Sequence, residues 1–220
     1  AVNQFKENAF EKNFYRFDKS ISVAQYKKDY WMPKLELKIN TIERELKEGA
    51  SREKINDDIQ LLYNEISKEC KLNKKIKCNE LDHINAKDYN PAIGEALRRG
   101  YLRELKDHYI NINNNAYYKK DELNRSMQKT KEEHEKFLKL QTEYDNENLN
   151  NLVKNSSEMI NKCIEKDGRL IQQCDPIFQD PTESKWGRAH FFAPRKNLFG
   201  RFYDTYWFNL CVIWFMSVTL

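Results

Sequence analysis

The chain has 220 residues, enough for one or two domains, and its 38 basic and 34 acidic side chains nearly cancel to a net charge of +4. Lysines and glutamates are interspersed and form no single basic face, which argues against a nucleic-acid-binding protein. Only 6 glycines and 5 prolines are present, which disfavours an all-β chain with many tight turns. We therefore expect an all-α protein whose charges lie on solvated helix surfaces.

The first 30 residues predict a helix, because apolar side chains recur at helical spacing at Phe10, Phe14, Phe17 and Ile21. A stripe that faces the core explains this spacing better than an aromatic binding surface does. Pro33 predicts a kink or a new helix start, since proline is well tolerated in the first helical turn.

Residues 31 to 70 predict an antiparallel helical hairpin. The joining residues are Gly49, which can end one helix, and Ser51, which can cap the next. Both segments carry an apolar stripe at helical spacing, and each stripe would cover the other. The stripes comprise Trp31, Leu35, Ile39, Ile42 and Leu46 in the first helix, and Ile55, Ile59, Leu62, Ile66 and Cys70 in the second.

The middle of the chain predicts a loop and then the longest helix. We expect residues 71 to 90 to form an irregular loop. Asn90-Pro91 predicts the capped start of the next helix. Asn111 to Asn115 predicts an interruption. From Ala116 to Lys166 we expect a helix about 70–75 Å long, ended by Gly168, with an asparagine-rich segment after Asp145 as a second candidate break. Its polar, coiled-coil-like seam comprises Leu123, Met127, Thr130, His134, Phe137, Gln141 and Tyr144.

The last segment is the most apolar, since no charged residue lies between Thr205 and Leu220. A bilayer crossing takes about 20 predominantly apolar residues. We interpret the run as the truncated start of a C-terminal transmembrane helix, in a chain cut from a longer protein at both ends. The alternatives are a core helix of a soluble domain and a helix exchanged between protomers.

The residues before the run predict an amphipathic elbow on the membrane surface. The expected domains are thus a helical domain at 1–180, the elbow at 181–200 and the start of the transmembrane helix at 201–220. Arg201 and Asp204 predict an ion pair at the membrane edge. The expected interface side chains are aromatic or basic, as membrane surfaces favour, and comprise Phe199, Phe202, Trp207, Arg195, Lys196 and Arg201.

Four of the five cysteines lie in the polar part of the chain, at Cys70, Cys78, Cys163 and Cys174. Two disulfides in an oxidising compartment are one interpretation, and pairing each cysteine with its neighbour in sequence costs the least loop entropy. Free thiols in a cytosolic domain are the alternative. The spacing does not fit a zinc site.

No catalytic, cofactor-binding or metal site is predicted. The chain has neither a glycine-rich phosphate loop nor a His-Glu-x-x-His motif. Glu132 to Glu135 includes His134 but no second histidine at helical spacing, so we interpret it as a solvated helix face. Missing motifs are the only argument against an enzyme, and that question stays open.

Four short segments near the C-terminus form a recognisable combination: Phe192-Ala-Pro-Arg-Lys196, Leu198-Phe-Gly-Arg-Phe202, Asp204-Thr205 and Trp207-Phe-Asn-Leu-Cys-Val-Ile-Trp214. Together they resemble the segment before the last membrane helix of a bacterial ABC exporter family, in which an ATP-binding cassette is fused to an ABCG-like membrane domain. The resemblance covers residues 185 to 220. It implies an extracytoplasmic domain at 1–180, a dimeric exporter, and ATP and magnesium bound in a cassette outside this chain.

We therefore expect a non-catalytic helical domain and the last membrane helix of an ABC-type exporter, which assist substrate export or contact a partner. The expected partners are membrane lipid and either a second copy or the rest of the same transporter, with no nucleic acid. The alternative is a membrane-tethered coiled-coil scaffold unrelated to transport. Basic residues before the apolar run favour a cytoplasmic flank, whereas the cysteines favour the extracytoplasmic side, which we adopt. These basic residues are Arg188, Arg195, Lys196 and Arg201.

Overall fold

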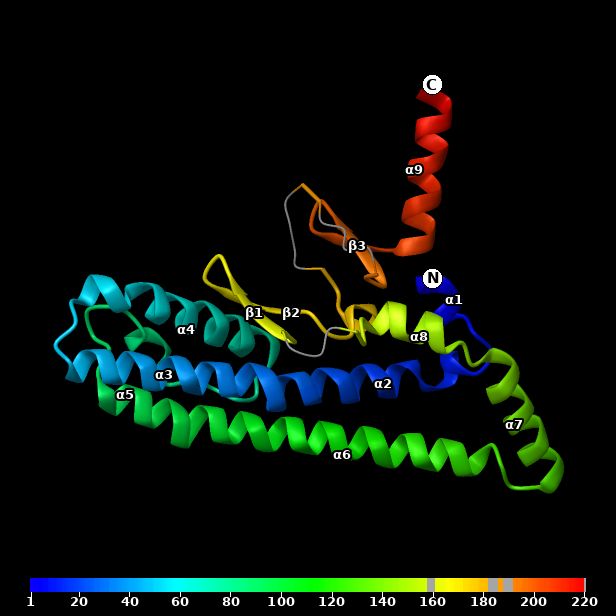
Figure 1. Cartoon of the computed structure of the whole chain (residues 1–220), viewed down its shortest axis with the longest axis horizontal. Coiled ribbons are helices and arrows are strands. Elements are labelled where there is room, and N and C mark those ends of the chain that lie inside the picture. Colours follow the sequence, from blue (N-terminus) through cyan, green and yellow to red (C-terminus); the bar gives the residue numbers. More distant parts are fainter. Residues whose placement is uncertain (158–160, 182–185, 188–191, 220) are drawn as a thin grey trace. The chain divides into compact units, whose positions relative to one another are not determined.

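The computed structural model describes residues 1–157, 161–181, 186–187 and 192–219, and these are mostly helical with two short antiparallel hairpins (Figure 1). The chain divides into two compact units. Unit 1 comprises residues 1–22, 116–160 and 173–220, and unit 2 comprises 23–115 and 161–172. This division differs from the expected domain at 1–180, because unit 1 gathers segments from both ends of the chain.

The predicted helical hairpin is confirmed in unit 2. Helices α3 (Met32–Lys47) and α4 (Arg52–Leu72) lie side by side in Figure 1. Gly49 has a φ of +78° and ends α3 as predicted, while Ser51 is the N-cap residue of α4 but makes no side-chain capping bond to a described residue. The facing side chains are fully or almost fully buried, and they comprise Leu35, Ile39, Ile42, Ile55, Ile59, Leu62 and Ile66.

The predicted kink or new helix start at Pro33 corresponds to a change of helix type immediately before it. A π-helical turn at Lys27–Trp31 connects α2 (Glu11–Tyr26) directly to α3, and Pro33 lies in the first turn of α3, where a missing N–H is tolerated. Asn90 caps α5 (Pro91–Ala96) as predicted, because its side chain accepts hydrogen bonds from the Ala92 and Ile93 amides at 2.9 and 3.3 Å.

The expected continuous helix from Ala116 to Lys166 is wrong, but the candidate break in the asparagine-rich segment after Asp145 is confirmed. A second π-helical turn at Leu97–Leu102 leads into α6 (Arg103–Ser126), which runs through Asn111 to Asn115 without interruption. Two further helices follow, α7 (Lys131–Tyr144) and α8 (Glu147–Lys154). Thr130 and Glu133 form a reciprocal capping box that starts α7, and Asn146 caps α8, so local side-chain hydrogen bonds set both breaks.

The coiled-coil-like seam is also not formed. In α7 only Phe137 is buried, while His134, Gln141 and Tyr144 are exposed. Phe137 packs edge-on against Phe10, with ring centroids 5.3 Å apart. A coiled-coil seam needs a partner helix along its whole length. The packing described for α7 is instead the contact between the Phe137 and Phe10 rings.

Residues 163 to 172 form a β-hairpin instead of a helix end. Strands β1 (Cys163–Lys166) and β2 (Arg169–Gln172) pair in antiparallel register and belong to unit 2. Asp167 and Gly168 both have positive φ, +53° and +64°, as a two-residue type I′ turn requires. The glycine therefore ends no helix but closes this turn.

Unit 1 contains α1 (Val2–Lys6), α7, α8, a short 3₁₀ turn at Pro176–Phe178 and the C-terminal elements. Its core includes Val2, Phe5, Val153, Ile177 and Phe178. A second hairpin, β3 (Arg195–Leu198) and β4 (Arg201–Asp204), leads directly into α9 (Thr205–Thr219).

Gly94 on α5 allows the close approach of α3 within unit 2. A Cβ atom there would meet the Glu43 carboxylate and would lie 2.9 Å from the Tyr89 hydroxyl and 3.0 Å from Ile39. We expect Gly94→Ala to destabilise unit 2 by about 1–3 kcal/mol, because overpacking forces neighbours from their positions.

Gly100 is the matched control, since it is also helical and has nothing within 4 Å of such a Cβ. Gly100→Ala should be neutral or stabilise by up to about 1 kcal/mol through loss of backbone entropy in the unfolded chain. Urea unfolding of the two variants measures the difference, and equal free energies of unfolding would contradict the packing described.

Candidate functional site

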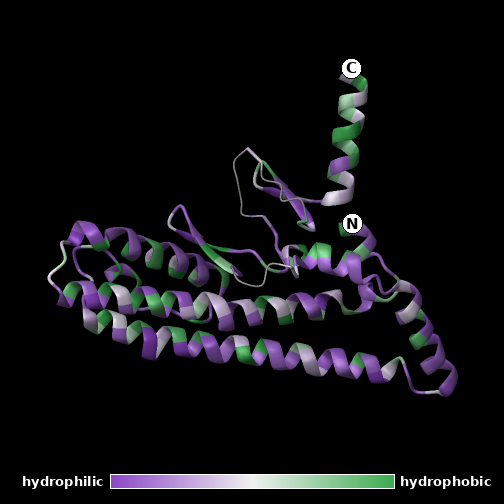
Figure 2. Cartoon of the chain, in the orientation of Figure 1, coloured by the Kyte–Doolittle hydropathy of each residue, from purple (hydrophilic) through white to green (hydrophobic). Residues whose placement is uncertain are grey.

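Helix α9 is the most apolar exposed surface among the described residues. Figure 2 shows it mostly in green and white, whereas α6 and α7 are dominated by purple. Most of its large apolar side chains are 42% to 86% exposed, and these comprise Tyr206, Trp207, Val212, Ile213, Trp214, Phe215, Met216 and Val218. They surround the helix instead of forming one stripe, so packing on a single neighbour would leave much of the surface uncovered.

The length of α9 does not complete the predicted transmembrane helix. It has 15 residues, or about 22 Å at about 1.5 Å per residue, against a hydrocarbon core of about 30 Å. Among the described residues, no helix combines the length and apolarity needed to cross a bilayer.

The described part of the predicted elbow at 181–200 contains strand β3 and the turn that leads to β4. Phe199 and Gly200 close its two-residue turn with φ of +50° and +75°. Phe199 and Trp207 are exposed as an interface would require, and Phe202 is half-buried, with the Arg195 guanidinium 5.0 Å from its ring centroid. Residues 182–185 and 188–191, which include Arg188, lie outside the described residues.

The basic residues of the hairpin have three different environments. Arg195 donates two hydrogen bonds to Asp180, at 2.9 and 2.6 Å, and Arg201 is exposed. Lys196 is buried, with only 5% of its surface exposed. Asp204 pairs with Lys6 at 3.0 Å and not with Arg201, because residues three apart on a strand point to opposite faces.

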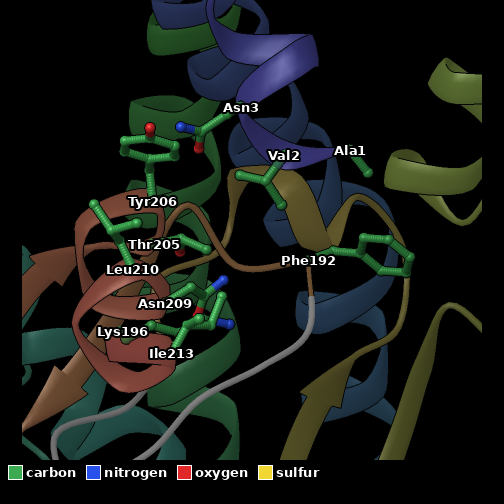
Figure 3. A pocket seen from close by; sticks show the side chains of 10 residues that line it. All are labelled: Ala1, Val2, Asn3, Phe192, Lys196, Thr205, Tyr206, Asn209, Leu210 and Ile213. Carbon is green, nitrogen blue, oxygen red and sulfur yellow. The ribbon is translucent and has the colours of Figure 1, made fainter. Parts of the chain in front are cut away.

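A cavity of about 440 Å³ lies where α9 leaves the hairpin (Figure 3). Its walls come from α1, β3 and the first turns of α9, all within unit 1. Thr205 anchors the start of α9, because its hydroxyl donates a 2.7 Å hydrogen bond to the Ala193 carbonyl. Lys196, Asn209 and Asn3 contribute polar groups to the lining. Its apolar part includes Val2, Phe192, Leu210 and Ile213.

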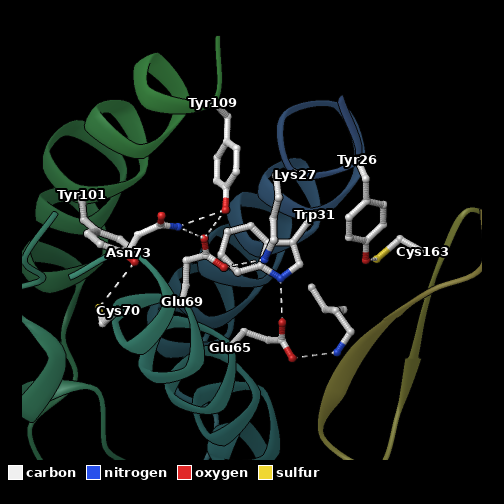
Figure 4. A network of polar contacts seen from close by, with 11 residues as sticks. Tyr26, Lys27, Trp31, Glu65, Glu69, Cys70, Asn73, Tyr101, Tyr109 and Cys163 are labelled. Atoms are coloured by element: carbon white, nitrogen blue, oxygen red, sulfur yellow. Dashed lines mark hydrogen bonds and ion pairs between the residues drawn. The ribbon is translucent and has the colours of Figure 1, made fainter. Parts of the chain in front are cut away.

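A second concentration of polar groups is buried in unit 2 (Figure 4). Glu69 on α4 is fully buried and accepts hydrogen bonds from Lys27 at 2.6 Å, Tyr109 at 2.5 Å and Asn73 at 2.6 Å. The Lys27 ammonium also lies 3.8 Å from the centroid of the Trp31 ring. One carboxylate thus holds together groups from α4, α6 and the π-helical turn before α3.

Glu65, one turn earlier on α4, also has both carboxylate oxygens hydrogen-bonded. It accepts a 2.6 Å hydrogen bond from the Trp31 indole and a 3.1 Å bond from the Leu170 amide on β2. The two glutamates therefore anchor the π-helical turn and the β1–β2 hairpin to α4.

Electrostatics favour a structural role for this buried network. Burial by itself would raise the pKa of Glu69, but Lys27, Tyr109 and Asn73 outweigh it and hold that pKa below its usual value. Burial is also the main reason that the pKa of Tyr109 is raised. The oxygens of both glutamates face donors of the chain itself, so this network has no open face for a substrate.

All five cysteines are free thiols, so neither expected disulfide is present. The Tyr26 hydroxyl donates to the Cys163 sulfur at 3.2 Å, and Cys70 donates to the Tyr101 hydroxyl at 3.4 Å. Burial raises the pKa of Cys78 to about 12, which makes it a poor nucleophile at neutral pH.

Within the part of the chain that the structure describes, no group of three or more His, Cys, Asp or Glu side chains is placed to hold a metal ion. His134 instead contacts Gln128, with 2.8 Å between Nδ1 and the amide oxygen. Sequence reasoning missed Lys196 as a cavity residue and Lys27 as a buried partner of Glu69, because both lysines resemble ordinary surface charges in the sequence.

Comparison with known proteins adds no relative: no family model, no curated protein and no solved structure matches this chain.

Proposed function

We propose that this chain is a membrane-attached helical module in which α9 enters the lipid bilayer. The observation that carries the proposal is the exposure of uncharged, largely apolar residues around α9. Full removal of one large aliphatic or aromatic side chain from water is worth about 1.5–3 kcal/mol, so a lipid environment would stabilise this helix strongly. Tyr206 and Trp207 are exposed in the first turn of α9, and Phe199 is exposed in the turn of the preceding β3–β4 hairpin. Such aromatic side chains suit the polar–apolar boundary of a bilayer.

The resemblance of residues 185 to 220 leads us to place this module in an ABC-type exporter. In this proposal α9 is the start of the last membrane helix, and the two helical units form an extracytoplasmic domain that assists substrate export or contacts a partner. ATP hydrolysis would belong to a cassette outside this chain. The alternative is a membrane-tethered scaffold or interaction protein unrelated to transport. The capped breaks before α7 and α8 mean that neither interpretation would use one long coiled-coil helix.

Flotation of the full chain with phosphatidylcholine vesicles tests the membrane attachment. We expect the wild type to float and Phe215→Lys to partition about 100-fold more weakly, because a lysine within the hydrocarbon costs about 2.5–3.5 kcal/mol.

Tyr118→Lys on α6 is the matched control, because Tyr118 is 72% exposed and Phe215 is 71% exposed. This variant should float like the wild type. A wild-type chain that stays with the soluble fractions, or an equal loss in both variants, would rule out insertion through α9.

The side of the membrane is tested separately with a cysteine placed on the exposed turn between α3 and α4. In cells that make the full chain, Ser51→Cys should react with a membrane-impermeant maleimide before lysis, above the signal of the parent chain. Reaction only after lysis would place the helical units in the cytoplasm and contradict the exporter orientation.

A further inference from the structure

The cavity at the base of α9 has the size and lining of a ligand site. Its volume of about 440 Å³ lies within the range of about 300–1,000 Å³ typical of small-molecule pockets. Such pockets combine an apolar lining with a few polar groups that orient the ligand. Val2, Leu210 and Ile213 supply apolar surface, and Lys196 and Asn209 supply polar groups (Figure 3).

Some polar residues of α9 line this cavity, and others are hydrogen-bonded within the helix. Ser217 and Thr219 donate hydrogen bonds to carbonyls of their own helix. Thr205 and Asn209 are one helical turn apart, on the same face, and both line the cavity. The Asn209 amide has no hydrogen bond to any residue that the structure describes, so its donors and acceptor are available to a ligand.

Lys196 brings a positive charge to the same place. It lies on β3, is only 5% exposed and lines the cavity. Burial lowers the pKa of Lys196, which shows that the surroundings disfavour its charged form. An ammonium has three donors, and an anion in the cavity would stabilise it beyond whatever the chain itself provides. Asp204 is already paired with Lys6 and accepts from the Tyr206 amide.

We propose that this cavity binds the phosphate headgroup of an anionic phospholipid. Lys196 and Asn209 contact the phosphate oxygens, and Leu210 and Ile213 contact the apolar part of the lipid. The choice of a lipid rests on the proposed insertion of α9, because the cavity opens beside the first turns of the helix that would enter the bilayer. The anion chemistry itself rests on Lys196 and Asn209.

Calorimetric titration of the full chain in an uncharged detergent tests this site. The probe is dihexanoyl phosphatidylglycerol, with dihexanoyl phosphatidylcholine and inorganic phosphate as comparison ligands. We expect saturable binding of the phosphatidylglycerol only. Lys196→Met should weaken it about tenfold or more, because a charge-assisted hydrogen bond is lost. Lys196→Arg should retain binding, and Lys12→Met, which removes an exposed lysine of unit 1, should leave it unchanged.

Several outcomes would overturn the proposal: equal binding of phosphatidylcholine, equal binding of inorganic phosphate, or an unchanged affinity in Lys196→Met. Should Lys196→Met fail to fold by circular dichroism, Asn209→Leu on the exposed surface of α9 decides instead, and an unchanged affinity there has the same meaning. Vesicle flotation separates the two proposals. A chain that floats on phosphatidylcholine but binds no phosphatidylglycerol contradicts only the lipid site, whereas the reverse result contradicts only the insertion of α9.

Discussion

Lys27→Met is expected to destabilise unit 2 by about 3–5 kcal/mol, because it leaves the buried Glu69 carboxylate without its cationic partner. The ammonium and the carboxylate are 2.6 Å apart, and Glu69 has no exposed surface through which water could replace the lysine. Urea unfolding followed by circular dichroism measures the loss. Lys71→Met on the exposed end of α4 is the control and should change the free energy of unfolding by less than about 0.5 kcal/mol.

The double variant Lys27→Met, Glu69→Gln distinguishes a lost charge pair from lost packing. Glutamine is neutral but still accepts hydrogen bonds from Tyr109 and Asn73, so the double variant should recover a large part of the stability. A double variant as unstable as the sum of the two single variants would contradict the charge-pair explanation.

The change in the free energy of unfolding at acidic pH tests the same interaction. The folded-state pKa of Glu69 is held below its usual value of 4.5. Its contribution to stability is therefore present above that value and is lost as the pH falls through the lower folded-state pKa. Glu69→Gln should accordingly lose less stability than the wild type on acidification below the usual glutamate pKa.

Leu62→Ala is expected to destabilise unit 2 by about 2–5 kcal/mol. Leu62 lies on the face of α4 that covers α3 and is fully buried, so the substitution removes apolar contacts and leaves a cavity inside the hairpin. Thermal or urea unfolding of the full chain measures the effect.

Leu72→Ala is the matched control on the same helix, because Leu72 is 67% exposed. Its free energy of unfolding should change by less than about 0.5 kcal/mol. If the two variants were equally stable, α3 and α4 would not cover each other in solution and the helical hairpin would be wrong.

The local sequence pattern was enough to predict the elements that are marked by apolar spacing or by a capping residue. The hairpin of α3 and α4 follows from two apolar stripes and a glycine at positive φ, and the start of α5 follows from the cap at Asn90. The β1–β2 hairpin carries a signal as well, an Asp-Gly pair between two short segments that each contain a pair of apolar residues, which a helical interpretation of Gly168 overlooked.

In other segments, helix propensity, capping and burial favour different structures, and the sequence pattern does not show which of them prevails. The asparagines at 111–115 have low helix propensity, but α6 continues through them because buried neighbours such as Tyr109 and Ala116 hold both sides of the segment. The long helix expected after Ala116 failed for the opposite reason, since the cap at Thr130 gives the chain a favourable place to stop and restart.

The sequence by itself determined that α9 is uncharged and apolar and that α3 pairs with α4, because hydrophobic pattern is a property of neighbouring residues. Only the tertiary structure decided the environment and the partner of each charged side chain. Lys27 is buried against Glu69, Asp204 pairs with Lys6, and Lys196 lines a cavity with Asn209. Lysine is strongly favoured at surfaces. Whether a particular one is buried depends on partners that the chain brings from far along its length.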